Sequence, residues 1–332
     1  MVRNRLENKF IDECQLLMLT RSGLAESGLA VAEVAARAVD PLPGTFAGIV
    51  VRLDGPEPGD KTPPDDPAVN PLSAGTPNYN FYTLEVVQRI GYDSFTPDNG
   101  VLIAKNKDSL RGRNGGPNEF NSYIWVIDAH PEDIRMADYV KPNGEKVMRT
   151  IADYRQLNDA LFHAGLDSGS YYEWEDTPNR LHFYVIDLKK DEDGILSYTL
   201  AVKSLDGSGR QARGAALAAP AESKVERPNT VVRFTLTNTG QAAGTTDVAG
   251  GEGAAGSHLN YDVYRLSVSV EGRGWSARLL NALAAVKPGE SGHVAVYMSR
   301  ENGSERSATV TLQAVSESEP SKTATASVKV SR

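Results

Sequence analysis

The sequence predicts a mainly β protein made of two antiparallel β-sandwich domains, with one short helix in the first. Three observations support this fold class. Segments rich in β-branched and aromatic residues recur along the chain, short turn-forming segments separate them, and a stretch rich in Gly, Ala, Ser and Pro divides them into two groups. This stretch, residues 206–228, has no strand period and is predicted to be a flexible linker. The predicted domains are therefore residues 1–205 and 229–332.

Five strands and one helix are predicted in the first domain. The strand segments are 80–90, 100–106, 121–129, 180–188 and 196–205. The helix is expected at 151–164, where Thr150 can cap the first turn, apolar residues share one face and Gly165 follows the last turn. Segment 29–39 fits neither the helical nor the strand period, so both interpretations stay open. Prolines and acidic residues predict an irregular surface loop at 54–78.

Alternation of apolar and polar residues predicts five more strands in the second domain. In the first of them Val232, Phe234 and Leu236 alternate with polar residues, which is the period of a strand with one buried face. The predicted strands are 231–238, 261–270, 293–299, 308–315 and 323–330. Such strands, joined by Gly- and Ser-rich turns, are typical of an antiparallel sandwich. The Gly- and Ala-rich segment 240–257 is expected to be a long mobile loop inside this domain.

Composition and charge exclude several classes of protein. The chain has 332 residues and a net charge of −8, so it lacks the basic balance that nucleic-acid binding requires. No apolar run reaches the roughly 20 residues of a membrane-spanning helix, and the N-terminal residues do not have the pattern of an export signal. Cys14 is the only cysteine, which excludes an internal disulfide, and it is expected to be a half-buried apolar residue.

The short motifs of hydrolytic enzymes are missing from the sequence. It contains no H-E-x-x-H zinc motif and no G-x-S-x-G nucleophile motif, and the five histidines lie too far apart to form a short ligand motif. We therefore assign no catalytic and no cofactor-binding residue. Glu173, Glu175 and Asp176 surround Trp174 in an arrangement that suggests sugar binding or glycoside hydrolysis. A loop with an aromatic anchor and solvated acids is the favoured interpretation.

Asp191 and Asp193 are weak candidates for calcium binding. Together with Gly194 they have the spacing of the start of a calcium loop, but the later ligands of an EF-hand, including its closing glutamate, are missing. A solvated hairpin turn is the favoured interpretation of this segment. Calcium binding in other acidic loops is left open.

The segment 81–108 carries a series of residues in a specific order and spacing. An aromatic pair leads into a Glu, a Gln-Arg pair, a Gly-aromatic-Asp-Ser group and an apolar strand. These residues are Phe81, Tyr82, Glu85, Gln88, Arg89, Gly91, Tyr92, Asp93, Ser94, Gly100, Leu102 and Ile103. The series resembles the immune inhibitor A-like metallopeptidases. Segments 122–133 and, more loosely, 8–20 are similar to the same family, so that the resemblance covers about residues 8–205. The sequence departs from the family at Ala104 and Lys105, where a Trp-His pair often follows.

The resemblance implies a jelly-roll-like β domain that follows a peptidase domain. The zinc-binding helix of the family, its general-base glutamate and its remaining ligand all precede the part resembled here. None of them can be assigned to this chain, so zinc is expected only in an upstream catalytic domain. Residues 227–332 resemble the immunoglobulin-like accessory modules of secreted bacterial enzymes, through TLTNTG at 235–240, GW at 274–275 and PGES at 288–291.

Two functional hypotheses follow, and whether the chain belongs to an enzyme stays uncertain. The leading one is a non-catalytic scaffold and accessory region of an extracellular zinc metallopeptidase, whose partner is the upstream peptidase domain. The alternative is a stand-alone extracellular protein that binds carbohydrate or a cell surface, or that self-associates. The physical interpretation of the 81–108 motif is structural. Glu85 and Arg89 share one side of a strand, where they can pair or contact a neighbouring strand, and Asp93 and Ser94 can bond turn amides.

Overall fold

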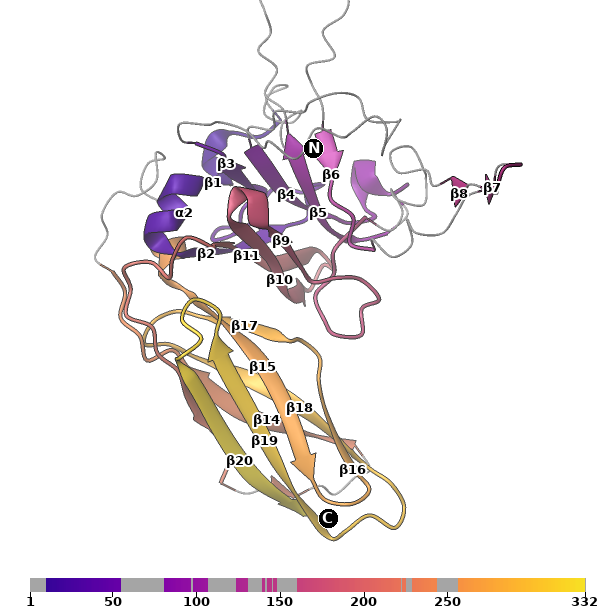
Figure 1. Cartoon of the computed structure of the whole chain (residues 1–332), viewed down its shortest axis with the longest axis vertical. Coiled ribbons are helices and arrows are strands. Elements are labelled where there is room, and N and C mark those ends of the chain that lie inside the picture. The colour runs from indigo at the N-terminus through magenta and orange to yellow at the C-terminus, as the bar shows by residue number, and fades with distance from the viewer. Residues whose placement is uncertain are drawn as a thin grey trace, which may run out of the picture.

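The computed structural model describes the following residues: 10–54, 81–96, 98–106, 124–130, 139–140, 142–144, 146–147, 160–221, 223–224, 229–243 and 256–331. They form two β units that stand end to end along the long axis of the molecule, one drawn in indigo to pink and the other mainly in orange to yellow (Figure 1). We refer to them as the upper and the lower unit. No helix among these residues is long and apolar enough to cross a membrane.

The upper unit is built from two sheets. One sheet has the strand order β1-β3-β4-β5-β6, and the other has the order β2-β11-β10-β9. All neighbouring strands in them are antiparallel except β1 and β3. Their bounds are β1 Leu16–Thr20, β2 Leu29–Ala35, β3 Gly48–Arg52, β4 Phe81–Val87, β5 Gly100–Asn106, β6 Ile124–Val126, β9 Glu173–Asp176, β10 Leu181–Lys190 and β11 Leu196–Ser204.

Short helical elements connect these strands. The α-helix α2, Arg21–Ser27, begins where the Thr20 side chain accepts a hydrogen bond from the Gly23 amide and ends at Gly28, whose φ is +81°. Single-turn helices and a small two-stranded ribbon complete the unit. They are η1 Glu13–Gln15, η2 Gly91–Asp93, η4 Thr177–Asn179, β7 Tyr139–Val140 and β8 Lys146–Val147.

The lower unit is also built from two sheets. Their orders are β12-β14-β18-β16 and β13-β20-β19-β15-β17, and only the β13–β20 pair is parallel. The bounds are β12 Ala216–Ala218, β13 Ser223–Lys224, β14 Asn229–Thr237, η5 Gly256–Asn260, β15 Asp262–Glu271, β16 Trp275–Leu279, β17 Leu283–Val286, β18 Ser291–Arg300, β19 Ser307–Ser316 and β20 Thr323–Ser331.

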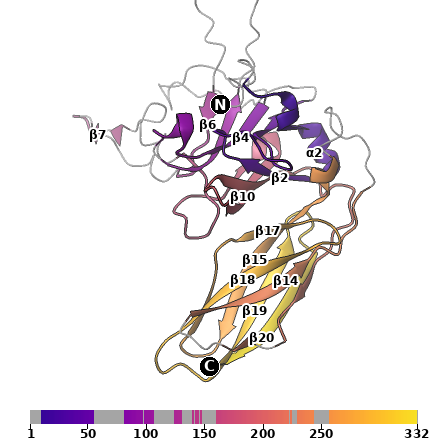
Figure 2. The ribbon, with the colours of Figure 1, turned by 180° about the vertical axis from the view of Figure 1, so that it is seen from behind.

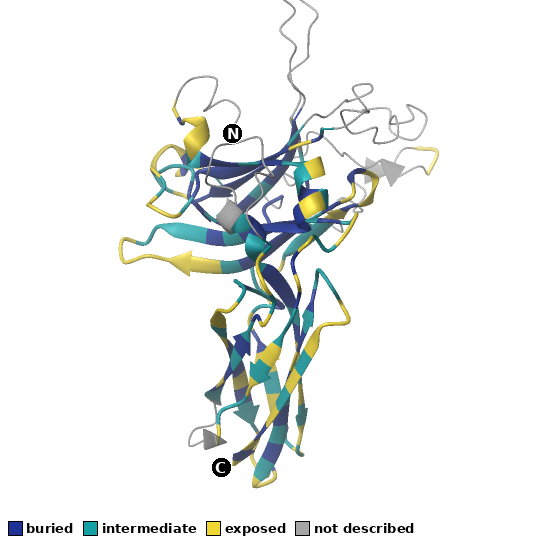
Figure 3. Ribbon diagram, turned by 90° about the vertical axis from the view of Figure 1, so that its left-hand side faces the viewer, coloured by how far each residue is buried: buried dark blue, intermediate teal, exposed yellow. Residues whose placement is uncertain are grey.

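Each unit encloses a core between its two sheets. In the upper unit Leu84 and Tyr82 of one sheet meet Phe183 of the other, and in the lower unit Phe234 meets Leu312. The strands of the lower unit alternate between buried and more exposed residues, whereas the inner strands of the upper unit are buried almost throughout (Figure 3). Both units are thus sandwich-like, because an apolar face on every sheet must be covered by another.

The predicted fold class is confirmed, since the chain is mainly β with two sandwich-like units and a single α-helix among the described residues. Every predicted strand overlaps an observed one. Segment 29–39, left open, contains β2, because Ala and Val side chains on both of its faces are buried. The alanines therefore serve close packing and not helix formation.

Several predictions about individual segments were wrong. The helix predicted at 151–164 is described only at residues 160–164, and this end of it is not helical, because Phe162 exchanges backbone hydrogen bonds with Val101 at 2.8 and 2.9 Å. Residues 151–159 lie outside the described residues. Residues 216–218 of the predicted linker form β12, which pairs with β14. Cys14 is exposed, since η1 lies on the surface ahead of β1.

Two predicted loops lie mostly outside the described residues. The proline-rich segment 54–78 is described only at Asp54, whose carboxylate accepts the Ser22 amide at 2.9 Å. The predicted mobile loop 240–257 is described at 240–243 and at the start of η5.

Candidate functional site at the junction of the two units

The interface between the two units is apolar at its centre. Seen from behind, β2 and β10 of the upper unit lie directly above β17 and β15 of the lower unit (Figure 2). The buried apolar residues that meet here are Leu29, Val31, Tyr184, Ile186, Ala201, Val263, Ala282 and Leu283. Burying one large apolar side chain stabilises a contact by roughly 1.5–3 kcal/mol. The units are therefore joined by a core of their own in addition to the connecting chain.

Arg213 is a buried cation at this junction. Its guanidinium donates hydrogen bonds to the backbone oxygens of Ser208 at 2.7 Å, Ser27 at 3.4 Å and Tyr261 at 2.7 Å. The carboxylate of Asp262 lies 3.6 Å from its Nη1 atom. Burial lowers the pKa of Arg213 and raises the pKa of Asp262, and the opposite charge of each partner works against that shift. Since Arg213 binds residues of both units, it connects them directly.

The connecting segment packs tightly against the end of α2. Gly28 and Gly209 both have positive φ, at +81° and +80°. A Cβ atom on Gly209 would lie 2.1 Å from the Ser27 backbone oxygen, and one on Gly28 would lie 2.5 Å from the backbone of Ser208. Residues 206–213 are therefore held against the upper unit before the chain enters β12.

A second ionic group crosses the junction at β15. Arg265 donates to both carboxylate oxygens of Glu173, at 3.1 and 2.6 Å, and its Nε atom donates to Glu317 at 2.6 Å. The Nε2 atom of His182 lies 3.2 Å from Glu173, and the Tyr184 hydroxyl donates to Glu317 at 2.8 Å. A bidentate Arg–carboxylate pair is strong and directional. This group therefore helps to fix how the units are oriented.

Acid is expected to weaken the junction through Glu173. Burial raises the pKa of this carboxyl, but hydrogen bonds from His182 and Arg265 outweigh burial and lower the pKa from 4.5 to about 2. Because the folded pKa is below the unfolded one, the stabilisation is complete above pH 4.5 and is lost as the pH falls toward 2. Urea unfolding at a series of pH values should show a smaller loss of stability in acid for Glu173→Gln than for the natural chain; the rest of the loss comes from other carboxyls with a lowered pKa, such as Glu33 and Asp54.

The neighbouring Glu175→Gln provides the control for this pH series. The Glu175 side chain is 49% exposed and does not contact Arg265 in the described structure, so this variant should keep the pH dependence of the natural chain. If Glu173→Gln kept the same dependence, Glu173 would not be its source.

The long connection between β14 and β15 also contributes to the upper unit. In η5 the Leu259 side chain joins the upper core, and the His258 ring meets the edge of the Phe46 ring at a centroid distance of 4.9 Å. The Nδ1 atom of His258 lies 3.1 Å from the Val31 backbone oxygen. Burial lowers the pKa of His258, which favours a neutral ring at this contact.

Residues of the 81–108 motif form a buried polar cluster inside the upper unit. The Tyr82 hydroxyl donates to the Asp176 carboxylate, and the Asn179 amide donates to Tyr82 at 2.7 Å and to Asp176 at 3.0 Å. The Nζ atom of Lys105 lies 3.3 Å from Asp176 and 5.4 Å from the centre of the Trp174 ring. Lys105 is thus the cation of this cluster.

Removing the hydroxyl of Tyr82 is expected to destabilise the upper unit. Tyr82→Phe leaves Asp176 and Asn179 with one partner fewer in a buried site, which costs about 1–3 kcal/mol. Urea unfolding measures the change. The matched control is Tyr92→Phe, because Tyr92 is 94% exposed and its hydroxyl should contribute almost nothing. Equal stabilities of the two variants would contradict the role of the cluster.

The acidic residues of the motif bind a basic residue that sequence reasoning did not find. Arg37 donates to Asp93 at 2.7 and 2.6 Å, and its Nη1 atom lies 3.8 Å from Glu85. Of the two alternatives for Glu85, the pairing with Arg89 was wrong, because β4 ends at Val87 and Arg89 is exposed. Only the tertiary structure brings residue 37 to this place, since the chain returns through β3 and β4.

Gln88 of the motif connects the two sheets. Its Nε2 atom donates to the Gly194 backbone oxygen at 2.8 Å, and its Oε1 atom accepts from the Leu196 amide at 2.8 Å. It therefore holds the hairpin between β10 and β11. In that hairpin Asp191 accepts the Ile195 amide at 2.7 Å, and both Asp191 and Asp193 are exposed.

The residues that the sequence suggested as a carbohydrate site have structural partners. Glu173 binds Arg265 and Asp176 lies in the Tyr82 cluster. Glu175 is half exposed, and its carboxylate lies 3.7 Å from the Nδ1 atom of His182, the ring that also contacts Glu173. The three belong to strand β9 and not to a loop, because they pair with β10. In the part of the chain that the structure describes, no three His, Cys, Asp or Glu side chains gather in a way that could hold a metal ion.

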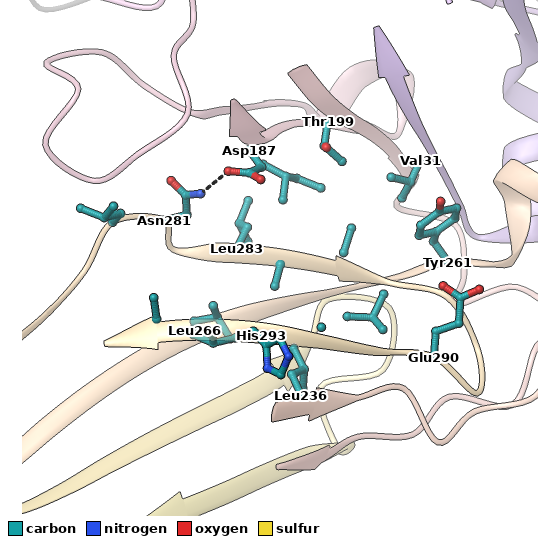
Figure 4. Close-up of a pocket in the computed structure, with 18 of the residues that line it drawn as sticks. Val31, Asp187, Thr199, Leu236, Tyr261, Leu266, Asn281, Leu283, Glu290 and His293 are labelled. Carbon is teal, nitrogen blue, oxygen red and sulfur yellow. Dashed lines mark hydrogen bonds between the residues drawn. The ribbon is translucent and has the colours of Figure 1, made fainter. Parts of the chain in front are cut away.

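An open cleft of about 460 Å³ lies beside the interface. Val31, Asp187 and Thr199 of the upper unit form one wall, and β17 and β18 of the lower unit form the other (Figure 4). The Asn281 amide donates to Asp187 at 2.8 Å between the two walls. The junction thus combines an apolar contact, two ionic groups and a solvent-accessible opening.

Comparison with known families locates two matches along the chain. A family model described as a middle domain matches residues 7–205, which is more than half of the chain. The chain belongs to this middle-domain family. A second family model, described as a peptidase M6-like domain, matches residues 213–332. The border between the two matches falls in the segment that carries Arg213.

The chain is similar to a protein from Arthroderma benhamiae, which is named as a secreted metallopeptidase. The two are 42% identical over 323 residues, which is 95% of this chain. The chain spans 45% of the length of that relative. More than half of the relative therefore has no counterpart in the sequence described here.

Two solved structures from Vibrio cholerae show weak similarity. They are the secreted serine protease VesC, with a TM-score of 0.23, 12% identity and coverage of 63% of this chain and 42% of that one, and the protease VesB, with a TM-score of 0.19, 11% identity and coverage of 93% and 97%. Similarity at this level supports no conclusion about fold or function.

Proposed function

We propose that this chain is the non-catalytic scaffold and accessory region of an extracellular zinc metallopeptidase of the immune inhibitor A type. Proteolysis would belong to a catalytic domain outside this chain, which would also hold the zinc. The upper unit would be a jelly-roll-like domain that supports the catalytic domain, and the lower unit an immunoglobulin-like module that acts as a spacer or surface-binding element. Residues 206–228 would connect the two modules.

The observation that carries the proposal is the way in which the two units are joined. Arg213 and Arg265 each bind groups of both units, and a buried apolar patch lies between them. Two units joined in this way suit a supporting role, because they would hold an attached catalytic domain in one orientation. The peptidase M6-like match over 213–332 and the name of the Arthroderma relative support the association with a metallopeptidase.

The motif residues of the upper unit fit the same role. Glu85, Gln88 and Asp93 are buried and bind Arg37 or the β10–β11 hairpin. Their position inside the unit is what a supporting domain requires, since buried ionic and amide contacts specify one arrangement of strands. In the described part of the chain the carboxylates of Glu85 and Asp93 face the Arg37 guanidinium and not an open active site.

Casein hydrolysis tests the proposal in two arms. The purified chain should leave casein uncut with and without added zinc, whereas the full-length Arthroderma relative should cut it and be inhibited by a chelator. Deleting from the relative the region that aligns with this chain should abolish secretion or casein hydrolysis. Chelator-sensitive cleavage by the chain alone would overturn the non-catalytic assignment. Unchanged secretion and hydrolysis after the deletion would overturn the scaffold role.

A further inference from the structure

The cleft beside the junction contains an unpaired strand edge. In the antiparallel pair of β15 and β17, the Leu266 amide bonds to the Ala282 backbone oxygen at 2.7 Å, and the register continues to Tyr264 opposite Ala284. Hydrogen-bonded and non-hydrogen-bonded pairs alternate along such a ladder. The amides and carbonyls of Leu283 and Ala285 therefore point away from β15. Within the described residues no hydrogen bond to these four groups is found.

The cleft passes around this edge. It is lined by Leu283, Ala284, Ala285 and Val286, which are consecutive residues of β17. Consecutive side chains of a strand point to opposite faces of the sheet. Leu283 and Ala285 accordingly pack toward the upper unit, whereas Ala284 and Val286 pack into the lower core. Because β15 covers the other edge of β17, one continuous cleft can reach both faces only around the unpaired edge.

A second unpaired edge borders the same space. Strand β16 pairs with β18 only from Val296 to Arg300, so among the described residues β18 has no neighbouring strand on that side from Ser291 to Ala295. His293 and Ala295 lie in this part of β18 and line the cleft. The pairing with β18 stops there because the chain leaves the sheet: β16 belongs to the sheet of β18, and after residues 280–282 the chain joins the other sheet as β17.

We propose that this cleft binds an extended segment of another polypeptide, which adds to the edge of β17 as a further strand. The unpaired amides and carbonyls of Leu283 and Ala285 supply the alternating donors and acceptors that only a polypeptide backbone matches in full. The side chains of Leu266, Leu279 and Val294 at the opening of the lower core receive apolar side chains at alternate positions of the segment. The site continues the apolar interface between the units, so that both units contact the bound strand.

The rim of the cleft adds a preference for a basic end. Glu33 is compensated, since Lys189 and Ser197 bind it. Lys287 lines the cleft beside Glu290, with its Nζ atom 5.3 Å from the centre of the Tyr261 ring, so the acid of Glu290 has a cation close by in the sequence. Among the described residues Asp187 binds the neutral Asn281 side chain, and its carboxylate therefore favours a lysine beside the apolar residues. The inference does not depend on the proposed function, because it follows from the strand edge itself.

A fluorescein-labelled hexapeptide, Lys-Val-Thr-Val-Thr-Val with blocked ends, tests the inference on the full chain by fluorescence anisotropy. It should bind saturably, and Ala285→Pro should weaken binding about tenfold, since proline removes an outward amide and one backbone hydrogen bond. The matched control is Ala277→Pro on the free edge of β16, which also loses an outward amide but lies outside the cleft. This control should bind like the natural chain.

A change in the ligand avoids any effect on protein folding. The same hexapeptide N-methylated at alternate residues keeps its side chains but loses the amides needed for strand addition, so it should bind at least tenfold more weakly. Amide hydrogen exchange of Leu283 and Ala285 should slow when the unmodified peptide is added. Equal binding of the methylated and unmodified peptides, loss of binding only in Ala277→Pro, or pairing of two copies of the chain in place of peptide binding would each overturn the proposal.

Discussion

Replacing Arg213 by alanine should lower the free energy of unfolding by about 3–5 kcal/mol, because it leaves the carboxylate of Asp262 buried without its counter-ion. The backbone oxygens of Ser208, Ser27 and Tyr261 lose their donor at the same time. Urea or thermal unfolding of the full chain measures the change. The expected loss is large because the side chain of Arg213 is only 3% exposed, so water cannot replace its contacts.

Two further variants make this result interpretable. Arg210→Ala, three residues earlier, removes a side chain that is 66% exposed and pairs with Glu26 at 3.2 Å, and it should change stability by less than about 0.5 kcal/mol. Asp262→Asn in the Arg213→Ala background should restore part of the loss, since it removes the uncompensated charge. A stability of Arg213→Ala close to that of Arg210→Ala would show that Arg213 does not hold the junction.

Placing a methyl group on Gly209 should destabilise the chain by about 2–5 kcal/mol, from strain at its positive φ and from overlap with the end of α2. The added Cβ atom of Gly209→Ala would lie 2.1 Å from the Ser27 backbone oxygen and 2.7 Å from the Gln211 side chain. Because the nearest atom belongs to the backbone, it cannot move aside as the end of a long side chain could. Unfolding in urea again measures the effect.

Gly289→Ala separates the strain of a positive φ from the steric overlap with α2. Gly289 has a similar φ of +75°, but a Cβ atom there would meet no atom within 4 Å. This variant should therefore show only the cost of the left-handed conformation, about 1–2 kcal/mol. A Gly209→Ala variant no less stable than Gly289→Ala would mean that residues 206–213 do not pack closely against α2.

The strands could be predicted because their signal is local. The alternation of Val232, Phe234 and Leu236 reflects one buried face, and it gave the position of β14 without knowledge of its partners. The strands that were not predicted are short or buried on both faces, as β3 is at Gly48–Arg52, and they lack that alternation. The described end of the helix expected at 151–164, residues 160–164, is not helical, because Phe162 makes a long-range pair with Val101 and is fully buried.

The candidate site could not be predicted in the same way, because its residues come from distant parts of the sequence. Arg213 resembled part of a flexible, polar linker, yet it is buried between Ser27 and Asp262. Glu173 resembled a solvated acid in a loop, and Arg265, which binds it, lies 92 positions away. An isolated charged residue gives no local sign that a partner of opposite charge will meet it after folding.

The sequence by itself determined that this protein is mainly β, that its strands form two groups and that the groups are separated near residues 206–228. These properties follow from side-chain periodicity and turn chemistry, which act over a few residues. The tertiary structure decided how the two groups are joined, which acids are buried and where a strand edge stays unpaired. Those outcomes depend on which surfaces meet when the chain closes on itself, and burial and hydrogen bonding across the junction arise only from that meeting.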